Sequence, residues 1–452
     1  MHTSSSETTP PNIILVTFDA LTARDMSLYG YHRPTTPFID RWAKNASVFT
    51  GAHAASSYTS PTTASLMTGK RVWSHMLYQP HGYMIRNNDT ENLPLLLSKA
   101  GYYNIALVQN KYTPLKAFSD HFDVVHPMSD FKISNSLTSY IDDGLYKYFA
   151  GKIIIYDWVI REDFIFRRFA DFLFKFLPDP LRYEYPADKV FSAFLWHIRN
   201  EPPQPFFAWL HIFPPHAPYI APAPYRGMFD SSSKIRTSEK LKGDKSKRFD
   251  IARAKYDELI RYCDNEFENF IEKLTEQTKN TVIILSADHG ESFEHDFIGH
   301  GFYLYEQITN IPLIIKGPDQ TEGRIVNGLV EQIDIAPTIL EFANIPVAPW
   351  MEGRSLLPVI QGKDFPSVPI FSMDLQENHS EEKIQHGVFS VWEDEYKLIH
   401  YLDDNKSLLF NLSDDPGEMN NIIDRNAETG KRLLTMIHDN LKKANERISV
   451  VD

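Results

Sequence analysis

The sequence predicts an α/β fold with a mainly parallel central sheet, and two observations support this prediction. NIILVTF at 12–18 and TVIILS at 281–286 are continuous apolar runs rich in β-branched residues, which is typical of strands buried on both faces. Amphipathic helical patterns lie between and around these runs. Because strands that alternate with helices form an open sheet covered on both sides, we expect three layers, with ligands bound beyond the carboxyl ends of the strands.

Two of the helical patterns stand out. Over 37–46, Thr36 can cap the helix, Pro37 suits its first turn, and the apolar residues share one face. Over 250–276, apolar residues recur at helical spacing and form one stripe. Cys263 lies on this stripe and is the only cysteine, so we expect it in the core. A single cysteine also excludes an intramolecular disulfide and a cysteine-clustered metal site.

The pattern changes after about residue 365. Three short apolar runs are joined by charged turns, which predicts an antiparallel meander. They lie at 387–393, 396–402 and 407–412. A helical pattern over 428–447 follows. We therefore expect a main α/β domain over 12–365 and a smaller C-terminal α+β subdomain over 366–452.

Composition excludes several classes of protein. Apolar residues make up 42% of the chain and charged residues 23%, which excludes wholesale disorder. The 46 basic and 59 acidic residues give a formal net charge of −13, and a surface this acidic repels phosphate backbones, so we expect no nucleic-acid partner. The N-terminus lacks a basic region before an apolar core, and no stretch reaches the ~18 uninterrupted apolar residues of a membrane span. We expect no transmembrane anchor and a cytoplasmic location.

Two segments have an unusual composition. From Tyr140 to Trp196, 17 of 57 residues are aromatic, and residues 234–248 hold seven basic and two acidic residues. The ordinary interpretations are an aromatic core insertion over about 130–200 and a solvated loop. The functional alternative is that the aromatic segment forms an apolar surface for a lipid or another apolar substrate, and that the basic segment beside it attracts anions.

Metal-ligating residue types follow both apolar strands. Asp19 comes directly after the first strand, and Asp288 and His289 come directly after the second. If both strands are parallel members of one sheet, the three side chains meet at the same edge. A lone aspartate at a strand end can equally cap a helix, but the aspartate–histidine pair favours a metal. Two oxygens and a nitrogen suit one divalent cation, with Zn, Mn or Ca as candidates.

A hydroxyl lies where it can act as a nucleophile. The segment TSPTTASLMTGK begins with Thr59, follows a strand-like run and continues into a helix-compatible stretch. A hydroxyl on the first turn of a helix lies at the positive end of the helix dipole. Threonine is a weak nucleophile unless its alkoxide is stabilised, which a divalent metal does directly. The alternative is an ordinary cap and turn before Pro61.

Two loops present histidines in a rigid frame. The run FFAWLHIFPPHAPY contains His211 and, in a proline-rich turn, His216. IGHGFYLYEQ places His300 between two glycines, which let the backbone approach a ligand closely. Such histidines can be surface or cap residues, but this framing also suits a positioned acid or hydrogen-bond donor.

In their order and spacing, these motifs resemble the sulfatase branch of the alkaline phosphatase superfamily over about 12–445. The motifs that carry the resemblance are NIILVTFDAL, TTPFIDRWAKNASVFTGAHA, TSPTTASLMTGK, HIFPPHAPY, ADHGESFEHDFIGHG, QIDIAPTILEFANIP, EGRSLLPVI and LLFNLSDDPGEMNNI. The resemblance implies an alkaline-phosphatase-like three-layer sandwich with a smaller C-terminal subdomain.

The chain departs from that family at the nucleophile. Sulfatases oxidise the cysteine or serine of their CxPxR motif to formylglycine, but Thr59 stands at that position and cannot form the aldehyde. Thr63 replaces the motif's arginine, and Ala20 replaces the second aspartate of the usual pair. The family's GKWH motif is missing, and Asn110 and Lys111 of LVQNKY occupy its region.

Threonine nucleophiles are instead a feature of the related phosphoethanolamine transferases, lipoteichoic acid synthases and nucleotide pyrophosphatases. DHGES followed by a glycine-framed histidine is most similar to the first two groups. By this resemblance, Thr59, His216 and His300 are the catalytic residues. The same resemblance assigns Asp19, Thr59, Asp288 and His289 to the metal, and Asn110, Lys111 and His211 to substrate binding.

The resemblance predicts a metal-dependent hydrolase or transferase that acts on phosphate monoesters or diesters, or on phosphonate esters, through a threonine nucleophile. The substrate would be a small molecule or a phosphoester of a lipid or glycan. One alternative is a sulfuric ester hydrolase that works without formylglycine. The other is a non-catalytic binding protein that keeps the fold.

Overall fold

The computed structural model describes residues 9–78, 90–131, 185–231, 245–274, 279–379 and 382–448. Most of the aromatic-rich segment and most of the basic segment 234–248 lie outside the described residues. The interpretations of these two segments therefore stay predictions.

A mainly parallel sheet of eight strands forms the centre of the fold, in the order β4-β3-β5-β1-β6-β7-β2-β8. Its strands span Asn12–Asp19 (β1), Ser47–His53 (β2), Tyr103–Val108 (β3), Val124–His126 (β4), Phe206–Pro215 (β5), Thr281–Ala287 (β6), Leu313–Lys316 (β7) and Arg324–Glu331 (β8). Among these strands, β7 alone runs antiparallel to its neighbours. The predicted α/β class and the two predicted strands are confirmed.

The two apolar runs identified in the sequence are central neighbours. Every residue of β1 and of β6 is buried, because helices cover both faces of the sheet. The two strands pair in parallel, with Phe18 opposite Ala287. The residues that follow, Asp19 and Asp288, therefore leave the sheet side by side at its carboxyl edge.

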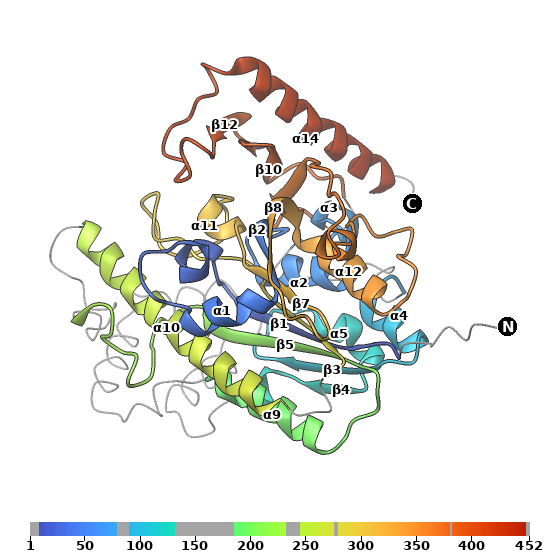
Figure 1. The fold of residues 1–452 in the computed structure, drawn as a ribbon. Helices are drawn as coiled ribbons and strands as arrows, with labels where there is room; N and C mark the ends of the chain where they lie inside the picture. Colours follow the sequence, from blue (N-terminus) through green and yellow to red (C-terminus); the bar gives the residue numbers. More distant parts are fainter. Residues whose placement is uncertain are drawn as a thin grey trace, which may run out of the picture.

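Helices lie on both sides of this sheet (Figure 1). They span Pro37–Trp42 (α1), Thr59–Thr68 (α2), Val72–His75 (α3), Leu93–Lys99 (α4), Leu115–Phe118 (α5), Ala187–Arg199 (α9), Lys245–Lys273 (α10), Glu306–Thr309 (α11), Ile335–Phe342 (α12), Leu357–Ile360 (α13) and Ala427–Ile448 (α14). On one side α9 and α10 pack against β5, and α1 packs against α10; on the other, α2, α4 and α12 contact one another. Within the described part of the chain, no helix combines the length and apolar character needed to cross a bilayer.

The start of α1 differs from the prediction. Thr36 does not cap the helix, because its hydroxyl donates to the side chain of Asp40 at 2.9 Å. Asp264 of α10 takes that place, since its carboxylate accepts the amide hydrogens of Phe38 at 3.0 Å and Ile39 at 2.8 Å. A long-range carboxylate thus satisfies the first turn of α1 and joins it to α10.

The long helix α10 buries its apolar stripe as predicted. Cys263 lies in the main hydrophobic core, and burial raises the pKa of its thiol well above the ordinary value. The only cysteine of the chain is therefore an inert core residue.

The C-terminal region forms a separate antiparallel sheet in the order β12-β11-β10-β9, with α14 packed on β10 and β11. Its strands span Ile370–Asp374 (β9), Val388–Glu393 (β10), Tyr396–Tyr401 (β11) and Lys406–Asn411 (β12). The predicted meander and helix are confirmed, and β9 adds a strand that the sequence pattern did not reveal.

A buried ionic cluster, here called the Lys397 cluster, joins this small sheet to α11 of the main fold. It consists of Lys397, Glu306, Glu418, Trp392 and His53. The ammonium of Lys397 lies 3.0 Å from Glu306 Oε1 and 2.7 Å from Glu418 Oε1. Trp392 Nε1 also donates to Glu306 Oε1 at 2.8 Å, and His53 Nε2 lies 3.2 Å from Glu306 Oε2. One lysine cannot neutralise two buried carboxylates, and burial raises the pKa of Glu418 to about 7.

Candidate functional site

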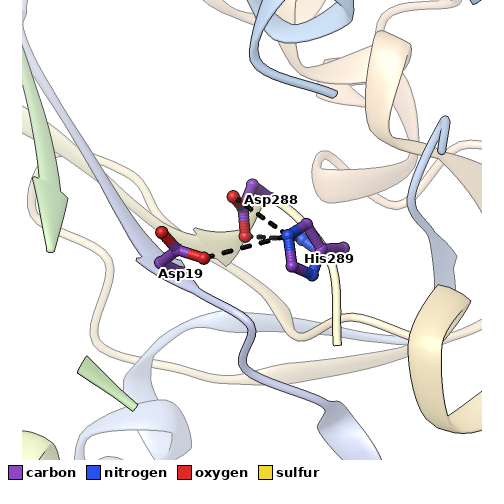
Figure 2. Close-up of side chains that lie close together, drawn as sticks. All are labelled: Asp19, Asp288 and His289. Atoms are coloured by element: carbon purple, nitrogen blue, oxygen red, sulfur yellow. Dashed lines mark hydrogen bonds and ion pairs between the residues drawn. The ribbon is translucent and has the colours of Figure 1, made fainter. Parts of the chain in front are cut away.

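Asp19, Asp288 and His289 converge beyond the carboxyl ends of β1 and β6. Each can offer one ligand atom so that all three atoms lie within 4.8 Å of one another. Nε2 of His289 is 3.8 Å from Asp19 Oδ1 and 3.6 Å from Asp288 Oδ2, and all three side chains are fully buried. Figure 2 shows them pointing toward one another. The predicted convergence at the sheet edge is confirmed.

The hydrogen bonding of these three residues fits a bound cation. Asp19 Oδ1 and Asp288 Oδ2 are buried and accept no hydrogen bond from any described residue. Such orphaned carboxylate oxygens are costly unless a cation pairs with them. His289 Nδ1 lies 3.0 Å from Gly290 O, which assigns its proton to Nδ1 and leaves the Nε2 lone pair facing the carboxylates. Burial lowers the pKa of His289, which favours the neutral form that a metal ligand needs.

A strained residue follows Asp19. Ala20 has a φ of 60°, in the left-handed region that costs a non-glycine residue about 1–2 kcal/mol. Its amide donates to Asp288 Oδ1 at 3.0 Å, and its carbonyl accepts the Tyr256 hydroxyl at 2.6 Å. The turn after β1 is thus tied to both Asp288 and α10, which holds the two aspartates in a fixed relation.

Thr59 is the first residue of α2 and lies against this cluster. Its hydroxyl oxygen is 3.5 Å from His289 Nε2, and Asn110 Nδ2 donates to it at 3.2 Å. The same amide of Asn110 also donates to Asp19 Oδ2. Asn110 therefore connects Thr59 to a carboxylate of the Asp/His cluster, at the positive end of a ten-residue helix.

His216 and His300 line the same region. The centroid of the His300 ring is 4.3 Å from that of His289 and 5.0 Å from that of His216. His216 Nδ1 lies 2.7 Å from Ala217 O, which assigns its proton to Nδ1. The structure thus brings His216 next to the two histidines of the motif ADHGESFEHDFIGHG, His289 and His300.

Glu291 was missed in the sequence, although it lies two positions after His289. It is buried, and its Oε1 lies 2.9 Å from His300 Nδ1. Burial alone would lower the pKa of His300, but the Glu291 charge and hydrogen bond raise it above the ordinary value. The sequence signal that could have identified Glu291 is its position in the motif ADHGES, which also contains the two candidate metal ligands Asp288 and His289.

Replacing Glu291 with glutamine should keep the hydrogen bond to His300 and remove the charge. We expect kcat to fall by about 10- to 100-fold with little change in KM, as is usual when an orienting carboxylate is lost. Because the charge raises the pKa of His300, the pH–rate limb that reports His300 should also move to lower pH. A variant with the parent's kcat and pH profile would exclude this role.

His211 lies deeper than a substrate-binding role needs. Its side chain is fully buried, and its Nε2 is 3.8 Å from Asp19 Oδ2 and 4.0 Å from Asp288 Oδ2. Trp209 Nε1 donates to Thr17 Oγ1 at 3.0 Å, and this hydroxyl is 2.9 Å from His211 Nδ1. The Thr17 hydroxyl thus holds Nδ1 of His211, and Nε2 of the same ring faces the two carboxylates. This position suits a residue that orients the carboxylates.

Lys111 has an exposed side chain next to Asn110. Its ammonium lies over the ring of Tyr112, 4.9 Å from the centroid. The substrate-binding roles of Lys111, His211 and Asn110 stay predictions, as do the catalytic roles of the other residues.

Comparison with known proteins extends over nearly the whole chain. The profile of the family described as Sulfatase matches residues 11–345, and one described as N-sulphoglucosamine sulphohydrolase, C-terminal, matches residues 294–447. A Delta 4,5-hexuronate-2-O-sulfatase of Bacteroides thetaiotaomicron is 25% identical over 439 residues, which cover 91% of this chain and 84% of that protein. Arylsulfatase K of Gallus gallus is 25% identical over 457 residues, which cover 94% and 81%.

Solved structures share the fold. A protein in complex with its substrate D-glucosamine-2-N,6-O-disulfate has a TM-score of 0.72 at 18% identity, covering 97% of this chain and 98% of that one. The phosphonate monoester hydrolase of Agrobacterium radiobacter has a TM-score of 0.70 at 18% identity, covering 97% and 96%. Together with the family match over residues 11–345, the eight-stranded sheet and the buried Asp/His cluster at its edge lead to one assignment: the chain belongs to the sulfatase family.

Proposed function

We propose that this protein is a metal-dependent hydrolase of anionic esters, in which the hydroxyl of Thr59 takes the place of formylglycine as the nucleophile. The observation that carries the proposal is the position of that hydroxyl, at the start of α2 and 3.5 Å from His289 in the Asp/His cluster. A hydroxyl at a helix N-terminus beside a cation site is well placed to attack the sulfur or phosphorus atom of an anionic ester.

Each neighbouring residue has one task in this proposal. Asp19, Asp288 and His289 hold the cation, which when bound lowers the pKa of the Thr59 hydroxyl and offsets charge on the ester oxygens. Thr59 Oγ1 forms a bond to sulfur or phosphorus as the free Nε2 of His216 takes up its proton, and the bond to the leaving oxygen breaks. His216 passes this proton to the leaving oxygen, and His300 stabilises the charge on the remaining oxygens. Water then releases the acid and regenerates the hydroxyl.

A sulfuric ester is the first candidate substrate. The curated relatives reported above are named as sulfatases, and a protein of similar fold was solved with a sulfated glucosamine. The substrate class that follows is a sulfate ester of a small glycan.

A phosphate or phosphonate ester is the second candidate, and Thr59 itself favours it. A threonine phosphoester can be attacked at phosphorus by water or an acceptor alcohol, whereas a sulfated threonine has no comparably easy route to hydrolysis. Phosphonate monoester hydrolases are among the proteins of similar fold. If an alcohol replaces water, the same site acts as a transferase.

A substrate panel separates these candidates. An aryl sulfate, an aryl phosphate monoester, an aryl phosphate diester and an aryl phosphonate monoester would be assayed with and without chelator, and with glycerol as an acceptor. We expect turnover of at least one ester, lost on chelation and restored by one of Zn²⁺, Mn²⁺ or Ca²⁺.

The preferred ester identifies the substrate class, and glycerol adducts identify transfer. Turnover unaffected by chelation would contradict the metal role, and no turnover of any ester with any metal would favour a binding protein.

A further inference from the structure

A cavity lies outside the candidate catalytic region. It has a volume of about 870 Å³ and is here called the Arg24 groove. Its walls come from the segment 24–32 that follows β1, the end of the α1 region at Lys44, and Val48 and Thr50 of β2. None of the lining residues belongs to the candidate catalytic or metal-binding set. The volume is within the range of sites that bind a small ligand.

The groove is basic in a strongly acidic protein. Arg24, His32, Lys44 and Arg324 line it, and among the described residues no ion pair joins Arg24, Lys44 or Arg324 to a carboxylate. Asp40 is the one acidic residue in the lining, and its two oxygens accept hydrogen bonds from the hydroxyls of Ser27 and Thr36, both at 2.9 Å. In a chain with a formal net charge of −13, such unpaired cations in a concave surface favour an anionic ligand.

Rigid aromatic rings form part of the same lining. Tyr29 is held by its hydroxyl, which accepts the amide hydrogen of Leu313 at 3.2 Å, and the hydroxyl of Tyr31 donates to Asp257 at 2.9 Å. Ile325, which is 70% exposed, adds apolar surface. Flat apolar surface next to cations suits a ligand that has both apolar ring faces and negative charges, which is the chemistry of an acidic sugar.

We propose that the Arg24 groove binds an acidic oligosaccharide that carries sulfate or phosphate groups. Arg24 and Lys44 bind the anionic groups, and Tyr29, Tyr31 and Ile325 contact the sugar rings. The segment 24–32 begins five residues after Asp19, so the groove and the metal cluster share one loop. Binding does not depend on the proposed reaction, because no lining residue takes part in it.

Isothermal titration calorimetry on the full chain tests this proposal in a Thr59→Ala background, which prevents turnover. The probes are a heparin tetrasaccharide, a phosphorylated mannopentaose and uncharged cellotetraose. The groove variant is Arg24→Gln/Lys44→Gln. The matched control is Lys363→Gln/Lys431→Gln, which removes the same charge from exposed positions outside the groove.

We expect at least one anionic probe to bind the parent and the control equally, and to bind the groove variant at least tenfold more weakly. Cellotetraose should bind at least tenfold more weakly than the anionic probe. Hydrogen exchange should show that the bound probe protects amides within 24–32, which locates the site even if the double variant folds poorly. The better anionic probe identifies sulfate or phosphate as the ligand group. Absence of binding to the parent, equal binding by the groove variant, or protection confined to the catalytic loops would overturn the proposal.

Discussion

Replacing Thr59 with alanine should abolish turnover of every ester that the protein hydrolyses. Removing a covalent nucleophile commonly costs about 10⁴-fold or more in kcat. The side chain is small and lies at the start of α2, where its hydroxyl contacts His289 and Asn110. We therefore expect the fold and the helix to survive the change. Steady-state rates on the preferred ester, with circular dichroism and metal content measured on the same samples, provide the check.

Two variants serve as controls for this prediction. Thr59→Ser keeps a hydroxyl at the same place and should retain most of the activity. Ser60→Ala removes the neighbouring hydroxyl, which donates to the carbonyl of Tyr112, and should have a small effect. A Thr59→Ala protein that keeps its metal, its fold and its rate would show that another group attacks the ester. Equal losses in all three variants would indicate a damaged helix N-terminus.

Replacing Lys397 with methionine should cause a large loss of stability without touching the catalytic region. The substitution leaves Glu306 and Glu418 buried without their cation, and breaking a buried ion pair from one side commonly costs about 3–5 kcal/mol. The methionine fills similar space, so the loss reports mainly the uncompensated charge. The change in the free energy of unfolding would be measured by urea denaturation.

Lys431→Met is the matched control, because Lys431 is exposed on α14 of the same C-terminal region. We expect it to change the free energy of unfolding by less than about 0.5 kcal/mol. Adding Glu418→Gln to Lys397→Met should recover more of the lost stability as the pH rises above 7, because the raised pKa of Glu418 leaves this carboxyl largely protonated at lower pH. If Lys397→Met and Lys431→Met unfold at the same urea concentration, the Lys397 cluster does not stabilise the fold.

The sequence predicted those features that depend on local pattern. The runs at 12–18 and 281–286 read as buried strands, and parallel pairing then required Asp19 to meet Asp288 and His289. The position of Thr59 on a first helical turn followed from the residues around Pro61 in the same way. Hydrophobic periodicity and residue order were sufficient for these conclusions.

The features that sequence reasoning missed depend on contacts between distant segments. Asp264 caps α1 from another helix, and Glu306 meets Lys397 only after the C-terminal sheet has packed on α11. No sequence pattern marks Glu291 as a functional residue. It contacts the His300 ring only because the loop between the two residues folds back on itself. A charged residue that is buried by tertiary packing resembles a surface residue in the sequence, so local analysis does not distinguish the two.

The convergence of the three metal-type ligands also couples cation binding to folding. Asp19 comes from the first strand, whereas Asp288 and His289 follow β6, so the set exists only when β1 and β6 are paired. An unfolded chain offers a cation no comparable site, and a cation bound here therefore stabilises the native state by mass action. At a free concentration of 100 times its Kd, such a ligand contributes about 2.7 kcal/mol. A cation that binds this cluster would therefore raise the thermal stability of the chain as well as complete the site.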